Sequence, residues 1–293
     1  MRWRGVLFDL GDTLIDNHPL QPEMADVQVA RAFELWLRRR SMRSADEFTP
    51  DERAQLASVD GQRLVTAVRA GMEEARRAYW SAGREAPAGS VFTELQSELA
   101  AASGLVASVA ELEEVYLKAR LARQRALPGA VELLARLRRA GLRCGLVSNC
   151  TFAAQLMQDH LRRHDLAALL DVTVYSSEVG WRKPRPEPFL VAAARLAMTP
   201  ADLVYVGNDP EADLAGGLGA GFSVMWFWGH DVRQEDHAVG KALGAGTWPN
   251  MGDDPELAAR LAEMVEEREG GPRLLAAAKT LEEVGALLLA GGE

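Results

Sequence analysis

The fold of this chain is decided by one stretch near its N-terminus, Val6-Leu7-Phe8-Asp9-Leu10-Gly11-Asp12-Thr13-Leu14. Three consecutive apolar residues, Val6 to Phe8, are typical of a short strand that is buried on both faces. Asp9 follows where such a strand would surface. Ligands of open α/β sheets bind beyond the carboxyl ends of the strands, so Asp9 is placed to take part in chemistry. An aspartate here is also a common turn residue or helix cap, so the rest of the sequence has to decide.

Composition limits the classes of protein to consider. The chain has 293 residues, which suits one large domain or two modest ones. Its net charge of −9 gives no general attraction to nucleic acid or to anionic membranes, so we expect neither as a partner. Only two cysteines are present, which indicates a reducing compartment. No apolar run is long enough for a membrane span or a signal peptide, and we expect a soluble, cytoplasmic protein.

Residues 17–124 are predicted to form a separate all-helical module inserted behind the first strand. Apolar residues recur at helical spacing in residues 21–40 and 60–82. The sequence Glu85-Ala86-Pro87-Ala88-Gly89 marks a break between helices. The helical spacing resumes from Phe92 to Ala119, and no stretch of the module has a credible strand pattern.

Strands and helices alternate after this module. Short apolar runs predict buried strands at residues 144–147, 172–175, 203–206 and 222–227, with helical patterns between them. This alternation predicts an α/β core with a parallel sheet, built from residues 1–16 and 125–293. Residues 229–254 look irregular, Asp254-Pro255 is a good helix start, and Leu281, Val284 and Leu288 predict a closing helix.

Polar residues follow four of the predicted strands, and the carboxyl ends of parallel strands meet at one edge of a sheet. Carboxylates bind Mg²⁺ because hard cations prefer oxygen ligands. Hydroxyl, amide and ammonium groups donate to phosphoryl oxygens, and a carboxylate can also act as the nucleophile. The residues in question are Asp9; Ser148 and Asn149; Lys183; and Asp209 with Asp213.

Four short motifs in this order resemble those of the haloacid dehalogenase (HAD) superfamily of hydrolases, in the branch with a helical cap inserted after the first motif. The motifs are Phe8-Asp9-Leu10-Gly11-Asp12-Thr13-Leu14, Val147-Ser148-Asn149, Lys183-Pro184-Arg185-Pro186, and Val206-Gly207-Asn208-Asp209 through Asp213. The resemblance covers residues 5–16 and 127–228. The long insertion between them matches the family only in its position after the first motif. The resemblance implies a Rossmann-like parallel core with residues 17–124 as the cap.

The resemblance also implies roles and a reaction. Asp9 would be the nucleophile and a Mg²⁺ ligand, and the Gly11 backbone carbonyl a second ligand. Ser148 would hydrogen-bond the transferring phosphoryl group, which Asn149 helps to orient, and Lys183 would neutralise Asp9 and the phosphate. The remaining metal ligands, direct or through water, would be Asp209, Asp213 and Asn208. The implied function is a Mg²⁺-dependent phosphatase that acts on a small phosphorylated metabolite through an aspartyl-phosphate.

The first motif departs from the phosphatase pattern, in which a second aspartate, two residues after the nucleophile, protonates the leaving alcohol. This chain has Gly11 there and Asp12 one residue later. General acid–base help is worth about 10²–10⁴-fold in rate. Three interpretations stay open. Asp12 reaches the leaving group after a rearrangement of the turn; or good leaving groups, cap residues or water replace the acid; or turnover is poor and the protein binds rather than catalyses.

The fourth motif is shifted as well, because Asn208 stands where the family has aspartate and Asp209 follows. We favour Asp209 as the charged ligand. Two alternative functions follow from the departures. One is a dehalogenase- or phosphonatase-like hydrolase, and the other is a catalytically weak HAD-like protein that binds a phosphorylated ligand or a partner. The sequence identifies neither the substrate nor the oligomeric state.

Overall fold

The computed structural model describes residues 3–17, 22–43, 48–228, 271 and 273–290. It divides into two compact units. The first, which we call the core unit, comprises residues 1–17, 125–150 and 161–293. The second, the helical unit, comprises residues 18–124 and 151–160. The irregular stretch expected at 229–254 and the helix start at Asp254-Pro255 lie outside the described residues.

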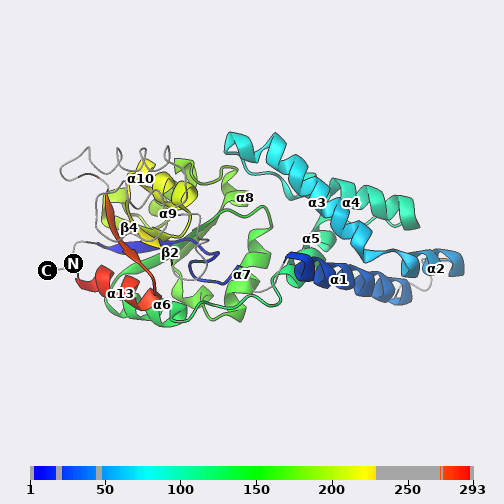
Figure 1. Ribbon diagram of the computed structural model, residues 1–293, viewed down its shortest axis with the longest axis horizontal. Coiled ribbons are helices and arrows are strands. Elements are labelled where there is room, and N and C mark those ends of the chain that lie inside the picture. The colour runs from blue at the N-terminus through cyan, green and yellow to red at the C-terminus, as the bar shows by residue number, and fades with distance from the viewer. Residues whose placement is uncertain (1–2, 18–21, 44–47, 229–270, 272, 291–293) are drawn as a thin grey trace. The chain divides into compact units, whose positions relative to one another are not determined.

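A six-stranded parallel sheet forms the centre of the core unit, with the strand order β3-β2-β1-β4-β5-β6 (Figure 1). Strands β2 and β3 lie on one side of β1 and strands β4, β5 and β6 on the other, so the winding of the sheet reverses at β1. Such a reversal is where open α/β sheets bind ligands. The strands are β1 (Gly5–Phe8), β2 (Arg143–Ser148), β3 (Val172–Tyr175), β4 (Leu203–Gly207), β5 (Ser223–Phe227) and β6 (Leu274–Ala278).

Helices cover both faces of this sheet. Figure 1 shows α6 (Ala130–Arg139) and α13 (Leu281–Ala290) on one side of the strands, and α9 (Pro186–Arg195) and α10 (Gly216–Gly219) on the other. Strands β1, β4 and β5 are buried along their whole length, as strands with both faces covered are, and this burial confirms the predicted fold class. Shorter segments complete the unit: the 3₁₀ turns Ala167–Leu169 and Pro200–Asp202, α8 (Ser176–Val179) and the π-helical turn Pro210–Ala215.

Strand β6 is the one strand among the described residues of the core unit that the sequence did not predict. Its residues, Leu274–Ala278, include three alanines, and alanine has little preference for strands. The strand forms because it pairs with β5, with a register shift between Val224 and Met225. The closing helix is confirmed as α13.

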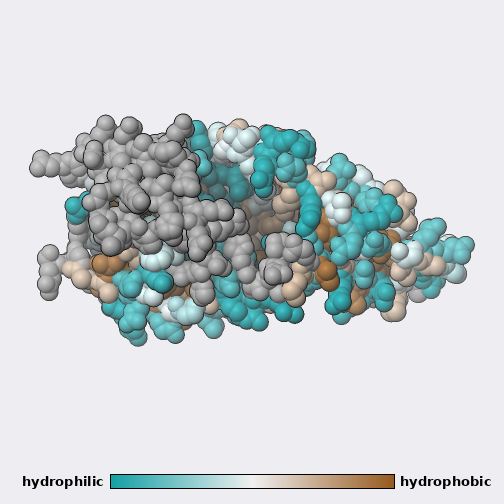
Figure 2. Space-filling view, viewed as in Figure 1, coloured by the Kyte–Doolittle hydropathy of each residue, from teal (hydrophilic) through white to brown (hydrophobic). Residues whose placement is uncertain are grey.

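The helical unit is built from α1 (Pro22–Arg43), α2 (Pro50–Ser58), α3 (Gly61–Ala78), the 3₁₀ turn Trp80–Ala82, α4 (Ala88–Ser103) and α5 (Val109–Arg120). A separate apolar core holds these helices together, with Phe33, Leu64, Phe92 and Leu95 fully buried in it. On the face shown in Figure 2, hydrophilic residues alternate with small apolar patches over this unit. The helical unit therefore has a core of its own, as independently packed modules do.

Two glycines let the helices of this unit approach closely. A Cβ on Gly61 would lie 2.3 Å from the carbonyl oxygen of Ala30 on α1. A Cβ on Gly71 would lie 1.8 Å from the carbonyl oxygen of Val91 on α4. Since real Cβ atoms do not come this close to backbone, both positions on α3 require glycine.

The segment Thr151–His160 packs with the helical unit although it directly follows the end of β2. Thr151 Oγ1 donates to Glu85 Oε1 at 2.8 Å, and the Ala153 amide donates to Glu113 Oε1. Phe152 stacks against Phe92 and Tyr116. Helix α7 (Ala154–Arg163) therefore begins in the helical unit and ends in the core unit.

Candidate active site

Asp9 lies at the carboxyl end of the central strand β1. Its amide donates to the Val206 carbonyl at 2.9 Å, which continues the pairing with β4 for one residue beyond the strand. Only 8% of the residue is exposed. The pairing on both sides of β1 fixes the backbone of Asp9, so its carboxylate is held at the edge of the sheet where strands β2, β1 and β4 end.

Lys183 supplies the counter-charge for Asp9. Its Nζ donates to Asp9 Oδ1 at 2.6 Å and to Asp213 Oδ1 at 2.6 Å. It also donates to the hydroxyl of Tyr205 at 2.8 Å and to the Val147 carbonyl at 3.0 Å. The lysine is buried, and four acceptors share its three hydrogens. A buried ammonium with this many partners is fixed in position.

Tyr205 is a member of this cluster that sequence reasoning missed. It lies in β4, and its hydroxyl is 2.9 Å from Asp213 Oδ1 and 3.3 Å from the Val147 carbonyl. The one available signal was a tyrosine inside an otherwise aliphatic strand, since a buried phenol needs a hydrogen-bond partner. Gly207 lies two positions after Tyr205, which places both residues on the same face of the strand.

Asp213 uses both of its carboxylate oxygens inside the core unit. Oδ1 accepts from Lys183 and Tyr205, and Oδ2 accepts from the amides of Asn208 and Asp209 at 3.0 Å each. The side chain packs over Gly207, where a Cβ would lie 2.4 Å from Asp213 Cγ. Asp213 therefore fixes the backbone that follows β4.

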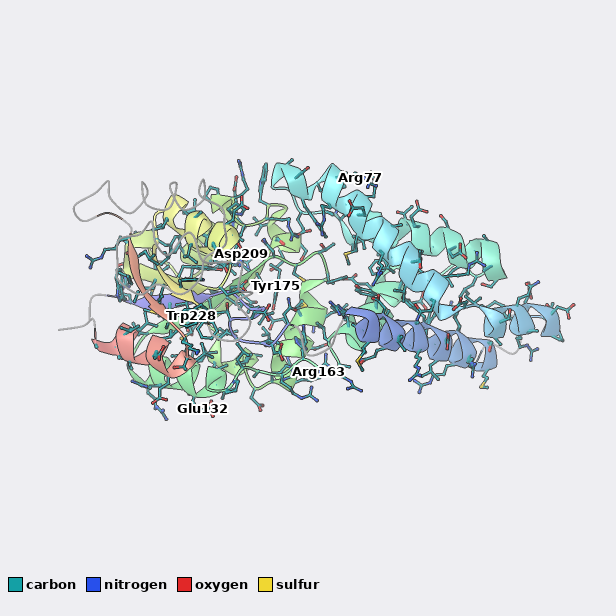
Figure 3. The ribbon with its side chains drawn as sticks, viewed as in Figure 1. Arg77, Glu132, Arg163, Tyr175, Asp209 and Trp228 are labelled. Carbon is teal, nitrogen blue, oxygen red and sulfur yellow. The ribbon has the colours of Figure 1, made fainter. Side chains whose placement is uncertain are left out.

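The neighbours Asn208 and Asp209 point to different partners. Asn208 Oδ1 accepts from the hydroxyl of Thr13 at 3.2 Å, so this amide reaches the loop after β1. Asp209 Oδ1 instead caps the following turn, accepting from the amides of Glu211 and Ala212 at 2.9 and 2.7 Å. Figure 3 labels Asp209 just beyond β4 and Tyr175 at the end of β3. Thr13, which is fully buried, was also not identified from the sequence.

The second motif lies at the end of β2, next to β1. Ser148 is the last residue of the strand and is buried. The side chain of Asn149 exchanges two hydrogen bonds with the backbone of Lys183: the Lys183 amide donates to Oδ1 at 2.8 Å, and Nδ2 donates to the Lys183 carbonyl at 3.0 Å. Asn149 thus positions the lysine that binds Asp9.

The turn after Asp9 is closed by Asp12. This residue has a φ of +57°, and its Oδ1 accepts from the amide of Asn17 at 2.8 Å. Its own amide donates to the Ile15 carbonyl at 2.7 Å. Aspartate is one of the few residues that tolerate this backbone conformation, and carboxylates often close such turns. The geometry of Asp12 is that of a turn residue.

Burial and the neighbouring charges both shift the pKa values of the side chains in this cluster. Burial raises the pKa of Asp9 to about 7, with Lys183 opposing the rise and Asp213 adding to it. Burial disfavours the Lys183 ammonium, but Asp213 and Asp9 outweigh it and raise the pKa of that lysine. Burial and the same two carboxylates raise the pKa of Tyr205 well above its usual value, so its hydroxyl stays protonated. Two buried carboxylates thus share one ammonium.

Comparison with known proteins identifies the family. The profile described as "Hydrolase: haloacid dehalogenase-like hydrolase" matches residues 3–221, which is more than half of the chain. The chain belongs to the haloacid dehalogenase-like hydrolases. This HAD-like hydrolase has no helix, in the part of the chain that the structure describes, that is long and apolar enough to cross a membrane.

Relatives of this HAD-like hydrolase include named phosphatases. It is 30% identical to hexitol phosphatase A of Escherichia coli over 229 residues, which is 77% of this chain and 83% of that protein. It is 30% identical to ribulose-1,5-bisphosphate 5-phosphatase of Halopiger xanaduensis over 154 residues, 53% of this chain and 62% of that protein. The solved structure of a 2-haloacid dehalogenase from Pseudomonas syringae shares the fold, with a TM-score of 0.57 and 22% identity, over 99% of this chain and 100% of that chain.

Proposed function

We propose that this HAD-like hydrolase is a Mg²⁺-dependent phosphatase of a small phosphorylated metabolite, with Asp9 as the nucleophile. The observation that carries the proposal is the buried contact of 2.6 Å between Asp9 Oδ1 and Lys183 Nζ at the reversal point of the sheet. The phosphatase names of the relatives, hexitol phosphatase A among them, support the reaction class.

The first half of the reaction would form an aspartyl-phosphate. A carboxylate oxygen of Asp9 attacks phosphorus, and the bond from phosphorus to the leaving oxygen breaks. Lys183 holds Asp9 in place through Oδ1, and Ser148, at the end of the neighbouring strand, would donate a hydrogen bond to a phosphoryl oxygen. In the second half, water attacks phosphorus and releases Asp9 as a carboxylate.

The donor atoms at this edge of the sheet fit Mg²⁺. Two buried carboxylates share one ammonium, and a phosphate monoester would add a charge of about −1.5 to −2. When bound, Mg²⁺ would neutralise this excess. We propose that Asp9, the Gly11 carbonyl and Asn208 hold it, because the Asn208 amide reaches the loop after β1. Mg²⁺ commonly uses only one or two carboxylates and completes its shell with water and phosphate oxygens.

The other two predicted ligands have different geometries. Asp213 uses both oxygens for four donors of the core unit, so we propose that it organises the site rather than binding the metal directly. Asp209 is engaged through Oδ1 in capping the turn after β4. Among the described residues, no three acidic, histidine or cysteine side chains form a metal cluster. The metal is therefore expected to bind together with substrate.

The test is hydrolysis of p-nitrophenyl phosphate with and without Mg²⁺, in the wild type and in Asp9→Asn. We expect Mg²⁺-dependent turnover in the wild type and none in Asp9→Asn. Asp51→Asn is the matched control, since it makes the same chemical change at an exposed position on α2 and is expected to keep full turnover. Acid quenching during turnover should trap phosphate on the peptide that contains Asp9.

A dehalogenase is the second candidate, and one observation favours it. Asn208 brings a neutral oxygen, not a carboxylate, to the loop after β1, while Lys183 already supplies Asp9 with a cation. This arrangement suits a nucleophilic carboxylate that acts without metal. Halide release from 2-chloropropionate in the presence of EDTA would favour this candidate. Phosphate release that requires Mg²⁺ would reject it.

A further inference from the structure

An amide side chain occupies the space beside residue 11, on the turn that follows the proposed nucleophile. A Cβ built on Gly11 would lie 3.1 Å from Asn17 Nδ2 and 3.3 Å from Asn17 Cγ. Residues 9–17 form one closed turn, in which the Leu14 and Ile15 amides donate to the Leu10 carbonyl at 2.9 Å each. The carboxamide of Asn17 is thus held next to the turn that begins at Asp9.

Two ionisable side chains near this turn, those of Asp12 and Lys183, form other hydrogen bonds within the core unit. Asp12 accepts the backbone amide of Asn17 through Oδ1 and sits in the left-handed conformation that closes the turn. The ammonium of Lys183 is buried and donates to Asp9, Asp213, Tyr205 and the Val147 carbonyl. The group placed beside residue 11 is therefore a carboxamide, which donates a hydrogen bond but does not release a proton at ordinary pH.

We propose that Asn17 is a specificity-determining residue that restricts this hydrolase to phosphoryl donors whose leaving oxygen departs without being protonated, namely acyl phosphates and aryl phosphates. This inference rests on the proposed phosphatase function. The Nδ2 hydrogen of Asn17 stabilises the leaving oxygen by a hydrogen bond. Alkyl phosphates, whose leaving alkoxide is strongly basic, are poor substrates because no proton is delivered to them.

Transfer of the phosphoryl group from these substrates needs no general acid. Asp9 Oδ bonds to phosphorus while the bond between phosphorus and the leaving oxygen breaks. The electron pair of that bond stays on the leaving group, which departs as a carboxylate or phenolate anion. A water oxygen then bonds to phosphorus, Asp9 leaves as a carboxylate, and the protons of the water depart with inorganic phosphate or pass to solvent.

The experiment measures kcat/KM for acetyl phosphate, a series of substituted phenyl phosphates and an alkyl phosphate. This parameter covers the steps up to departure of the leaving group, so slow hydrolysis of the aspartyl-phosphate does not hide the effect. The variant Asn17→Asp places a carboxyl group of nearly the same shape beside residue 11, and this group can act as a general acid in its protonated form. Asn17 is exposed, and the bond that it gives to Asp12 Oδ1 comes from its backbone amide, which the variant retains.

We expect kcat/KM of the wild type to fall steeply as the leaving group becomes more basic, with the alkyl phosphate about 10²-fold or more below phenyl phosphate, the lower range of general acid catalysis. Asn17→Asp should raise the ratio of alkyl to aryl phosphate hydrolysis about tenfold or more. A second variant, Gly11→Asp combined with Asn17→Ala, restores an acid at residue 11 and removes the 3.1 Å contact. It should act in the same direction.

Comparable rates for alkyl and aryl phosphates in the wild type would overturn the inference. So would an unchanged ratio of the two rates in both variants, with thermal unfolding showing that the variants are folded. Either result leaves the phosphatase function intact as long as aryl turnover requires Asp9. Aryl turnover that is absent, or that persists in Asp9→Asn, would instead reject the proposed function itself.

Discussion

Tyr205 joins the lysine and the aspartate that organise the site, and its hydroxyl can be removed without disturbing the core. The ring packs edge-on against Phe189, with centroids 4.8 Å apart, so Tyr205→Phe keeps this contact. The variant leaves Asp213 Oδ1 without one donor and Lys183 without one acceptor. A hydrogen bond to a charged group contributes about 1.5–3 kcal/mol, so we expect the free energy of unfolding to fall by about that amount.

The same change should lower kcat of Tyr205→Phe more than it raises KM, because Lys183 would be less firmly held against Asp9. A loss of about 1.4 kcal/mol of transition-state stabilisation is a tenfold fall in rate. Tyr175→Phe is the control, since it removes the hydroxyl of another buried tyrosine, at the end of β3 (Figure 3). Equal kinetic effects of the two substitutions, measured on p-nitrophenyl phosphate, would contradict a special role for Tyr205.

Among single residues, the sequence predicted those that carry a charge or follow a strand, but not the residues that contact them. Asp9, Lys183 and Asp213 do converge, as expected from their places after parallel strands. Thr13 was missed because its partner Asn208 lies 195 residues further along the chain. Tyr205 was missed because its contacts with Lys183 and Asp213 form only in the folded site, and spacing does not reveal such contacts. Asn17 was missed because the closing of the turn by Asp12, which brings it beside Gly11, is a matter of backbone geometry.

At the scale of single elements, strand β2 is tied at its start by one carboxylate. Asp171 Oδ2 accepts from the amide of Cys144 at 2.9 Å, and Oδ1 binds Arg138 and Arg143 at 2.9 and 3.0 Å. Burial works against the ionised form, but the hydrogen bonds from the Cys144 amide and the two arginines outweigh it and lower the pKa of Asp171. The carboxylate therefore stabilises the fold while it is ionised.

The sign of the pH dependence follows from this lowered pKa. Above the pKa of the unfolded chain, near 3.8, Asp171 is ionised in both states and its full contribution is present. The contribution is lost as the pH falls through the lower pKa of the folded state. We expect Asp171→Asn to cost about 1–3 kcal/mol at pH 7, typical of hydrogen bonds to charged groups.

Thermal or urea unfolding from pH 7 downward measures this difference. It should shrink below pH 4, where the wild-type carboxyl becomes neutral like the asparagine. Asp51→Asn, which makes the same chemical change on the exposed first turn of α2, is the control. A difference between wild type and Asp171→Asn that stays constant over the whole pH range would contradict the electrostatic explanation.

Whether a helix or strand could be predicted depended on how clearly its own residues indicate it. Strands β1 to β5 contain mostly apolar runs, and such runs are predictable because burial within a sheet favours them. Strand β6 was missed because an alanine-rich segment becomes a strand only through its neighbour. Helix α2 was missed too, although Thr49 and Glu52 form a capping box that is readable in the sequence.

For the molecule as a whole, the charge balance among Asp9, Asp213 and Lys183 determines whether the metal is needed for folding or only for turnover. Lys183 contacts both Asp9 and Asp213 at 2.6 Å, so these carboxylates have a partner within the core unit itself. Each unit has its own apolar core. The fold is therefore expected to stand without Mg²⁺, whereas the charge that phosphate adds to the cluster calls for a cation during reaction.

We accordingly expect EDTA to abolish hydrolysis of p-nitrophenyl phosphate while leaving the far-ultraviolet circular dichroism unchanged. Added Mg²⁺ should raise the melting temperature only slightly, because a ligand stabilises by RT ln(1 + [L]/Kd), and one held by few charged ligands binds weakly. Asn208→Asp adds a charge beside Thr13 and should lower the Mg²⁺ concentration that gives half-maximal activity, whereas Asn208→Ala should raise it. Unfolding of the wild type in EDTA would show that the metal, and not Lys183, balances the buried carboxylates.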